Sequence, residues 1–175
     1  MFKSFCASAL LMFSANAIAA DYLIKKSSDN KITWTAVGNP GFLRINGKAG
    51  WVEGTAVDTG GMLSGDFSVI LDSFDTGMNL RNEHMRDKYL ETKKYPKATF
   101  KLDSFKMSDT PTAFSGDLTL KGATKKINGK MSVKSKKVMA TFMVNLGDFP
   151  IGVPSWKEIS MAKEVEVTVE FPLGG

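Results

Sequence analysis

The chain of 175 residues is 43% hydrophobic and 23% charged, and its formal net charge is +5. This length accommodates one domain with a hydrophobic core but hardly two, and the ordinary apolar fraction excludes an intrinsically disordered chain. The basic residues are scattered along the sequence, which excludes a typical nucleic-acid-binding surface.

Residues 1–19 have the pattern of a secretory signal peptide. A positively charged start and an apolar run over 5–13 precede the small-x-small pattern Ala17-Ile18-Ala19. The apolar run is shorter than the ~20 residues that a membrane span needs. We therefore predict cleavage before Ala20 and export to the periplasm or outside the cell.

The remaining chain, 20–175, is expected to form one β-rich domain without cysteine chemistry. The single cysteine, Cys6, would leave with the signal peptide, so disulfides and thiolate nucleophiles are excluded. Alternating apolar and polar residues predict a first series of strands, and Gly47 and Gly50 suggest bends of the kind that close a sheet on itself. The predicted strands of this series cover 22–25, 31–36, 43–57 and 62–73.

A charged segment with helical spacing then interrupts the strands. Its side chains recur three or four residues apart, which predicts a helix. Asp75 or Thr76 is expected to cap the first unpaired N–H groups of this helix. Pro96 marks the entry to the next strand, because it cannot donate to a strand ladder. The residues that set the helical spacing are Met78, Arg81, Met85 and Tyr89.

Alternation returns after the helix and continues to the end of the chain. Long antiparallel strands with one apolar face bury that face either between two packed sheets or inside a closed barrel. Strand length and internal glycines favour the barrel. We therefore predict an all-β fold, an antiparallel β-barrel of about eight strands with one inserted helix. The strands of the second series cover 98–102, 114–120, 127–133, 138–146 and 165–171.

Three ordered blocks of sequence resemble one known family. They are Asp75-Thr76-Gly77 with Arg81 to Arg86 and Lys94 to Phe100, then Gly116 to Lys125, then Phe149 to Pro154. Together they resemble the YceI-like family of bacterial, secreted, polyisoprenoid-binding proteins. The resemblance implies a lipocalin-like barrel over 20–175 with the helix at its side or mouth.

This chain departs from that family in its second block. Relatives often carry a histidine there, whereas this chain has Leu118, Leu120 and Lys121. No role of that histidine is therefore carried over to this chain.

The apolar faces of the predicted strands supply a set of inward-facing side chains. In a small barrel such side chains can fill the interior by themselves, but Gly116, Gly129 and Ala140 lie at inward positions and suggest unfilled volume. With the resemblance, we expect a non-enzymatic protein that holds a long isoprenoid or similar amphiphile for transport, storage or scavenging. No cofactor is required, and the expected ligand is an isoprenoid quinone or polyprenyl lipid. The expected lining residues are Phe67, Val69, Leu71, Phe100, Leu102, Phe114, Leu118, Leu120, Phe142, Val144, Val167 and Val169.

Two arginines of the helix are candidates for a polar or phosphate head group. Arg81 and Arg86 can contact oxyanions because a guanidinium group donates paired hydrogen bonds. The alternative is that they only pair with carboxylates of the same helix. The scattered cations also suggest transient contact with an anionic membrane or a membrane protein. The final strand, if left at an open edge, would pair two copies into a homodimer.

The sequence offers little for catalysis or metal binding. His84 is the only histidine, and the serines lack a nucleophile-elbow context, so we assign no catalytic and no metal-binding residues. The alternative function is a filled barrel that binds a membrane redox or stress-response protein, because methionine-rich surfaces adapt to partners. The residues of that alternative surface are Met139, Met143, Met161 and Trp156.

Overall fold

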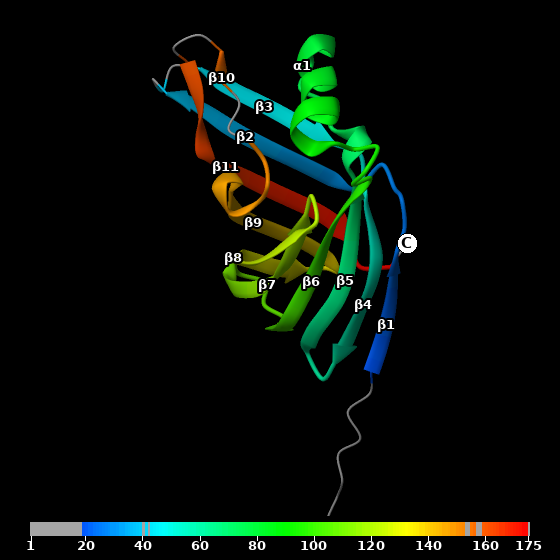
Figure 1. Cartoon of the computed structure of the whole chain (residues 1–175). Helices are drawn as coiled ribbons and strands as arrows, with labels where there is room; N and C mark the ends of the chain where they lie inside the picture. Colours follow the sequence, from blue (N-terminus) through cyan, green and yellow to red (C-terminus); the bar gives the residue numbers. More distant parts are fainter. Residues whose placement is uncertain (1–18, 40, 42, 153–154, 157–158, 175) are drawn as a thin grey trace, which may run out of the picture.

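The computed structural model describes residues 19–39, 41, 43–152, 155–156 and 159–174, so the predicted signal peptide lies outside them apart from Ala19. The described residues form one antiparallel sheet with a single longer helical segment inserted between β5 and β6 (Figure 1). The strands are β1 (Ala19–Ile24), β2 (Lys31–Asn39), β3 (Arg44–Ala49), β4 (Val52–Thr59), β5 (Met62–Ile70), β6 (Lys97–Lys106), β7 (Thr112–Leu120), β8 (Ala123–Lys134), β9 (Lys137–Asn145), β10 (Ser155–Trp156) and β11 (Ile159–Pro172). The helical elements are η1 (Leu71–Ser73), α1 (Asn79–His84), the π-helical η2 (Met85–Leu90) and η3 (Leu146–Asp148).

The sheet follows the order β1-β4-β5-β6-β7-β8-β9-β11-β2-β3, with β10 added beside β11. It curls into a half-barrel, and the chain itself crosses from one edge strand, β3, to β4 through Gly50 and Trp51. The edge at β3 is tied to the chain after β5 by two backbone hydrogen bonds, from Lys48 N to Asp75 O at 2.9 Å and from Asp75 N to Lys48 O at 2.8 Å. The predicted antiparallel barrel-like fold with one inserted helix is confirmed.

Two details of the predicted strands change. The expected strand over 43–57 is two strands, because the chain bends at Gly50 as its sequence suggested, and β10 is an additional short strand. The final strand is not an edge, since β11 pairs with β9 on one side and with β2 on the other. The idea that an open final strand joins two copies is therefore wrong. The edge strands of the described sheet are β1 and β3.

The helix begins differently from the prediction. Met78 is the N-cap residue of α1 and makes no capping hydrogen bond through its side chain. Asp75 Oδ1 instead accepts hydrogen bonds from Gly77 N and from Asn82 Nδ2, both at 2.8 Å, and Thr76 N donates to Asn82 Oδ1 at 2.8 Å. The predicted cap by Asp75 or Thr76 is therefore wrong. Both residues hold a turn before the helix, and the helical residue Asn82 secures that turn.

The helix ends on the barrel wall. Glu91 has a left-handed backbone with φ of 49° and stops η2. Its carboxylate accepts a hydrogen bond from Lys121, a nearly buried lysine in the β7–β8 turn, which holds the pKa of Glu91 below its ordinary value. Met85, Tyr89 and Leu90 pack into the apolar interior beside this ion pair. Met85 and Tyr89 thus form the inward side of the helix, whereas Met78 from the same predicted spacing is 52% exposed.

The interior consists of two hydrophobic clusters. The large cluster contains Ile24, Ile32, Val52, Ala56, Leu63, Leu102, Phe105, Phe114, Met131, Val133, Val138, Ala140, Phe171 and Leu173. The helix-side cluster contains Leu71, Leu90, Leu118, Leu120, Ile127, Val144, Phe149 and Ile151. Phe100, Phe142 and Val167 pack against both clusters and join them.

Candidate ligand-binding interior

All twelve predicted lining residues belong to or pack against the two interior clusters. Successive side chains of a strand point to opposite faces, so the alternation in the sequence correctly separated inside from outside. Six of them are buried, namely Leu71, Leu102, Phe114, Leu118, Leu120 and Val144. The other six are only half-buried although they face inward, namely Phe67, Val69, Phe100, Phe142, Val167 and Val169.

The half-buried residues follow the strand register across the wall. Phe67 of β5 lies opposite Phe100 of β6, Phe142 of β9 lies opposite Val167 of β11, and Val167 lies opposite Trp34 of β2. We call these five residues the inner belt. A close-packed interior would bury large inward-facing side chains completely. Their partial exposure shows that solvent-accessible surface remains along the inner belt.

Trp34 is the member of the inner belt that was not predicted as a lining residue. It alternates with the buried residues Ile32 and Ala36, so the same period-two pattern already placed it inside. The edge of its indole ring lies directly over Gly47 of β3, where any Cβ would collide with the ring. The buried Nε1 atom of Trp34 has no hydrogen-bond partner among the described residues.

Three phenylalanines of the interior form a compact aromatic group. The ring centroids of Phe100 and Phe114 are 6.0 Å apart, those of Phe114 and Phe142 6.1 Å apart, and those of Phe100 and Phe142 6.4 Å apart. A Cβ on Gly116 would lie 2.8 Å from Cε2 of Phe100, and a Cβ on Gly129 would lie 2.7 Å from Cε1 of Phe114. Rings therefore occupy the space above both glycines. The expectation that these two glycines mark unfilled volume is wrong, because their missing side chains make room for the rings.

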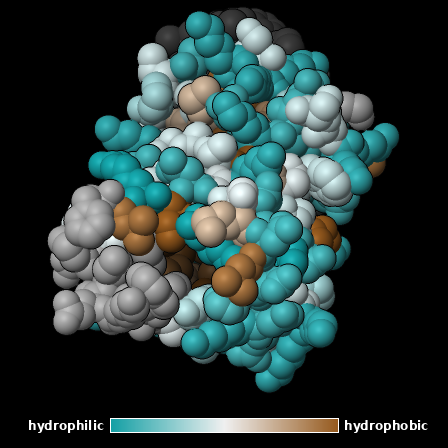
Figure 2. All heavy atoms as spheres, turned by 90° about the horizontal axis from the view of Figure 1, so that it is seen from above, coloured by the Kyte–Doolittle hydropathy of each residue, from teal (hydrophilic) through white to brown (hydrophobic). Residues whose placement is uncertain are grey.

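The end of the molecule that carries α1 is hollowed. Figure 2 shows this face as largely hydrophilic, with hydrophobic atoms in a recess near its middle. Such an arrangement, an apolar interior below a polar rim, is typical of sites for amphiphilic molecules.

The two head-group candidates lie on the helix without strong partners. Nε of Arg86 is 3.6 Å from Oδ1 of Asp72, an exposed carboxylate outside the helix. A guanidinium nitrogen of Arg81 lies 2.9 Å from Sδ of Met78, and no ion pair of Arg81 occurs within the described residues. The predicted alternative, pairing with helix carboxylates, is absent from this part of the chain. A small recess at the end of the helix is lined by polar and charged residues, among them Arg86, Lys93 and Lys94.

Metal-ligating residues, apolar helices and exposed methionines are the other features that bear on function. Within the described ranges, no group of three or more histidine, cysteine, aspartate or glutamate residues is arranged to hold a metal ion. None of the helices in these ranges is long and apolar enough to cross a membrane. Met139 and Met143 are each 45% exposed on the outer side of β9, whereas the side chains of Trp156 and Met161 fall outside the described set. Two separate exposed methionines do not make an extended apolar patch.

Comparisons with known proteins agree on one family. The model of the YceI-like domain matches residues 24–173. Protein YceI of Escherichia coli O6:H1 is 34% identical over 131 residues, which is 68% of this chain and 65% of that protein. The UPF0312 protein plu2095 of Photorhabdus laumondii is 30% identical over 132 residues, which is 69% of this chain and 65% of that protein. The chain thus matches just under two thirds of the length of these relatives.

Solved structures share the fold at low sequence identity. A polyisoprenoid binding domain from Saccharophagus degradans, implicated in plant cell wall breakdown, matches with a TM-score of 0.66 and 17% identity over 88% of this chain and 98% of that one. BcnA of Burkholderia cenocepacia matches with a TM-score of 0.65 and 18% identity over 83% of this chain and 98% of that one. The YCEI protein of Campylobacter jejuni matches with a TM-score of 0.53 and 16% identity over 98% and 91% of the two chains.

Proposed function

Because the chain belongs to the YceI-like domain family, we propose that it is a non-enzymatic binding protein that holds a long isoprenoid or similar amphiphilic lipid inside its barrel. The observation that carries the proposal is the inner belt, whose aromatic and branched side chains face inward but are only half-buried. A hydrocarbon chain laid against them would remove their remaining surface from water, which is favourable in proportion to the apolar area buried. The fold shared with a polyisoprenoid binding domain supports the choice of ligand.

The energetics of burial favour a long chain over a small ligand. Each buried CH₂ contributes about 0.8 kcal/mol, so one five-carbon isoprene unit contributes roughly 4 kcal/mol before costs. Lost translational and rotational freedom opposes binding by about 4–15 kcal/mol. Micromolar affinity requires about −8 kcal/mol in total. Several isoprene units are therefore needed, and an isoprenoid quinone or a polyprenyl lipid supplies them.

The polar end of the ligand would lie beside the helix. Arg81 and Arg86 keep unused hydrogen-bond donors there, because one has no carboxylate partner among the described residues and the other has only a long contact to Asp72. A guanidinium group that is free to reorient can donate two hydrogen bonds to a phosphate or carbonyl oxygen. This position leaves the hydrocarbon chain free to enter the apolar interior.

The cellular role that fits such a protein is transport, storage or scavenging of the lipid in the periplasm. The signal-like residues 1–19 support the location. Lipid exchange would require transient contact with a membrane, and the scattered lysines would favour an anionic surface.

Native mass spectrometry of the protein purified from its own host tests the function. We expect a hydrophobic adduct at one per chain that solvent extraction releases as an isoprenoid lipid. A protein that carries no adduct, and remains unliganded after incubation with prenyl quinones and prenyl phosphates, would refute the proposal.

A pair of variants on one strand then tests the interior location. Phe142→Asp places a carboxylate in the inner belt and should abolish lipid retention, because burying an unpaired charge is costly. Met143→Asp is the matched control, since Met143 is the next residue of β9 and points outward. Equal retention by the two folded variants would place the lipid outside the barrel.

A further inference from the structure

We propose that Phe100, Phe114 and Phe142 form a stop inside the barrel that determines how long a ligand chain can be accommodated. This inference rests on the proposed function and adds the residues that set its specificity. The three rings come from β6, β7 and β9 and enclose one another at centroid distances of 6.0–6.4 Å. They thus lie side by side on one stretch of the wall, since β6 and β7 are neighbours in the sheet and only β8 separates β7 from β9.

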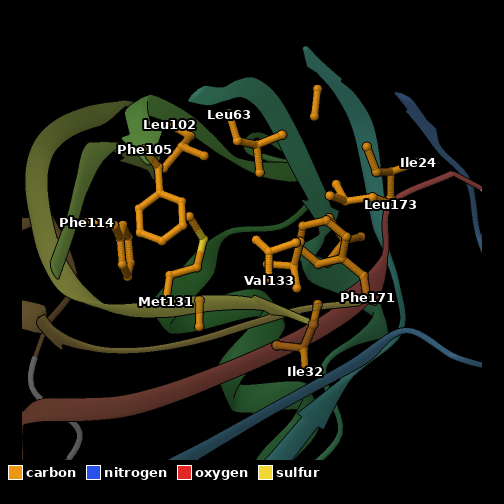
Figure 3. Close-up of a cluster of buried hydrophobic side chains, with 14 residues drawn as sticks. Ile24, Ile32, Leu63, Leu102, Phe105, Phe114, Met131, Val133, Phe171 and Leu173 are labelled. Atoms are coloured by element: carbon orange, nitrogen blue, oxygen red, sulfur yellow. The ribbon is translucent and has the colours of Figure 1, made fainter. Parts of the chain in front are cut away.

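Beyond the rings lies the buried part of the large cluster. On the side away from the helix, the next inward residues of β6, β8 and β9 belong to the large cluster: Leu102 follows Phe100 on β6, Met131 follows Gly129 on β8, and Ala140 precedes Phe142 on β9. These three residues are only 4%, 4% and 8% exposed. Figure 3 shows Phe114 beside Phe105 and Met131 in this cluster, with side chains from opposite walls pointing toward one another. A hydrocarbon chain finds no room among them.

The rings themselves border the accessible interior. Phe100 and Phe142 are half-buried members of the inner belt, whereas Phe114 behind them is fully buried. A chain that covers the inner belt therefore meets Phe100 and Phe142 as the last surfaces before the filled cluster.

The backbone of the wall is adapted to hold the rings in place. Phe100 lies over Gly116, and Phe114 and the Cβ of Phe142 lie against Gly129. A ring seated on a glycine reaches further across the strand than it could over any larger residue. The two glycines of the wall therefore determine where the rings of the stop lie.

The experiment compares binding of a series of linear prenols from two to ten isoprene units, measured by competition with a fluorescent fatty-acid probe. The wild-type protein should gain affinity with each unit up to a limiting length and then gain no more. The double variant Phe100→Leu with Phe142→Leu removes about six carbons in total, roughly the size of one isoprene unit. We expect its limiting length to rise by about one unit, with at least about tenfold tighter binding of the next longer prenol.

A matched control separates the stop from general loss of packing. Phe105→Leu shortens a ring that is 3% exposed in the large cluster and lies outside the inner belt. It should lower thermal stability and leave the limiting length unchanged. An unchanged limiting length in the double variant, or the same shift in Phe105→Leu, would overturn the stop while leaving the proposed function intact. Absence of prenol binding by the wild-type protein at every length would overturn the proposed function and the stop together.

Discussion

Replacing Gly129 by alanine tests whether the wall glycines seat the aromatic rings or mark empty volume. The new Cβ would lie 2.7 Å from Cε1 of Phe114 and 2.7 Å from Cβ of Phe142, and it would also meet the backbone oxygen of Thr141. The backbone oxygen cannot move without disturbing the β8–β9 ladder, so the rings or the strands must shift. Forcing an extra group into a well-packed site costs about 1–3 kcal/mol. We therefore expect Gly129→Ala to lower the free energy of unfolding by that amount.

Urea denaturation followed by tryptophan fluorescence measures this change, and Gly152→Ala is the control. No atom of the described residues lies within 4 Å of a Cβ built on Gly152, and a tolerated Gly→Ala replacement stabilises by about 0.4–1 kcal/mol through the unfolded chain. The two variants should therefore change stability in opposite directions. A Gly129→Ala protein as stable as Gly152→Ala would show that the space above Gly129 is empty and would refute the reasoning about the rings.

Two further predictions concern the ends of the helix. Lys121 holds the pKa of Glu91 below its ordinary value of 4.5, so their ion pair stabilises the fold above about pH 4.5 and this contribution is lost as the pH falls through the lower pKa of the folded state. Glu91→Gln should flatten the pH dependence of the urea midpoint below about pH 4.5, and an unchanged slope would contradict the assignment. At the other end, Asn82→Ala removes the acceptor of the Thr76 N–H and should cost about 1–3 kcal/mol. Hydrogen exchange of α1 should accelerate in this variant; protection equal to the wild type would show that Asn82 does not anchor the helix.

The sequence alone was sufficient to predict which side chains of the strands point into the barrel and which point outward. A strand has a period of two, so an alternating pattern such as Val165 to Phe171 leaves only the choice of which face is apolar. The single helix was also evident, because Met85 and Tyr89 follow a different period from the strands around them. Both signals are local, and tertiary structure did not override either of them.

Contacts between distant segments could not be read from these patterns. The pairing of β11 with β2, which removes the final strand from the edge of the sheet, joins residues more than a hundred positions apart. The same holds for Lys121, whose nearly buried ammonium group is explained only by Glu91 at the end of the helix. The predicted cap of α1 by Asp75 was wrong because Asp75 Oδ1 instead accepts two hydrogen bonds of 2.8 Å, one within the turn before the helix and one from Asn82.

The glycines show why a correct position can still be misinterpreted. Gly116 and Gly129 do face inward, as the alternation predicted, but whether a small inward residue leaves a void depends on its neighbours across the sheet. Phe100 reaches Gly116, and Phe114 reaches Gly129, only because the β6–β7 and β7–β8 registers place each ring over the adjacent strand. Accessible surface remains instead on the large residues of the inner belt. In this barrel, side-chain size along the sequence is therefore a poor guide to empty volume, and ligand length should respond to the rings and not to the glycines alone.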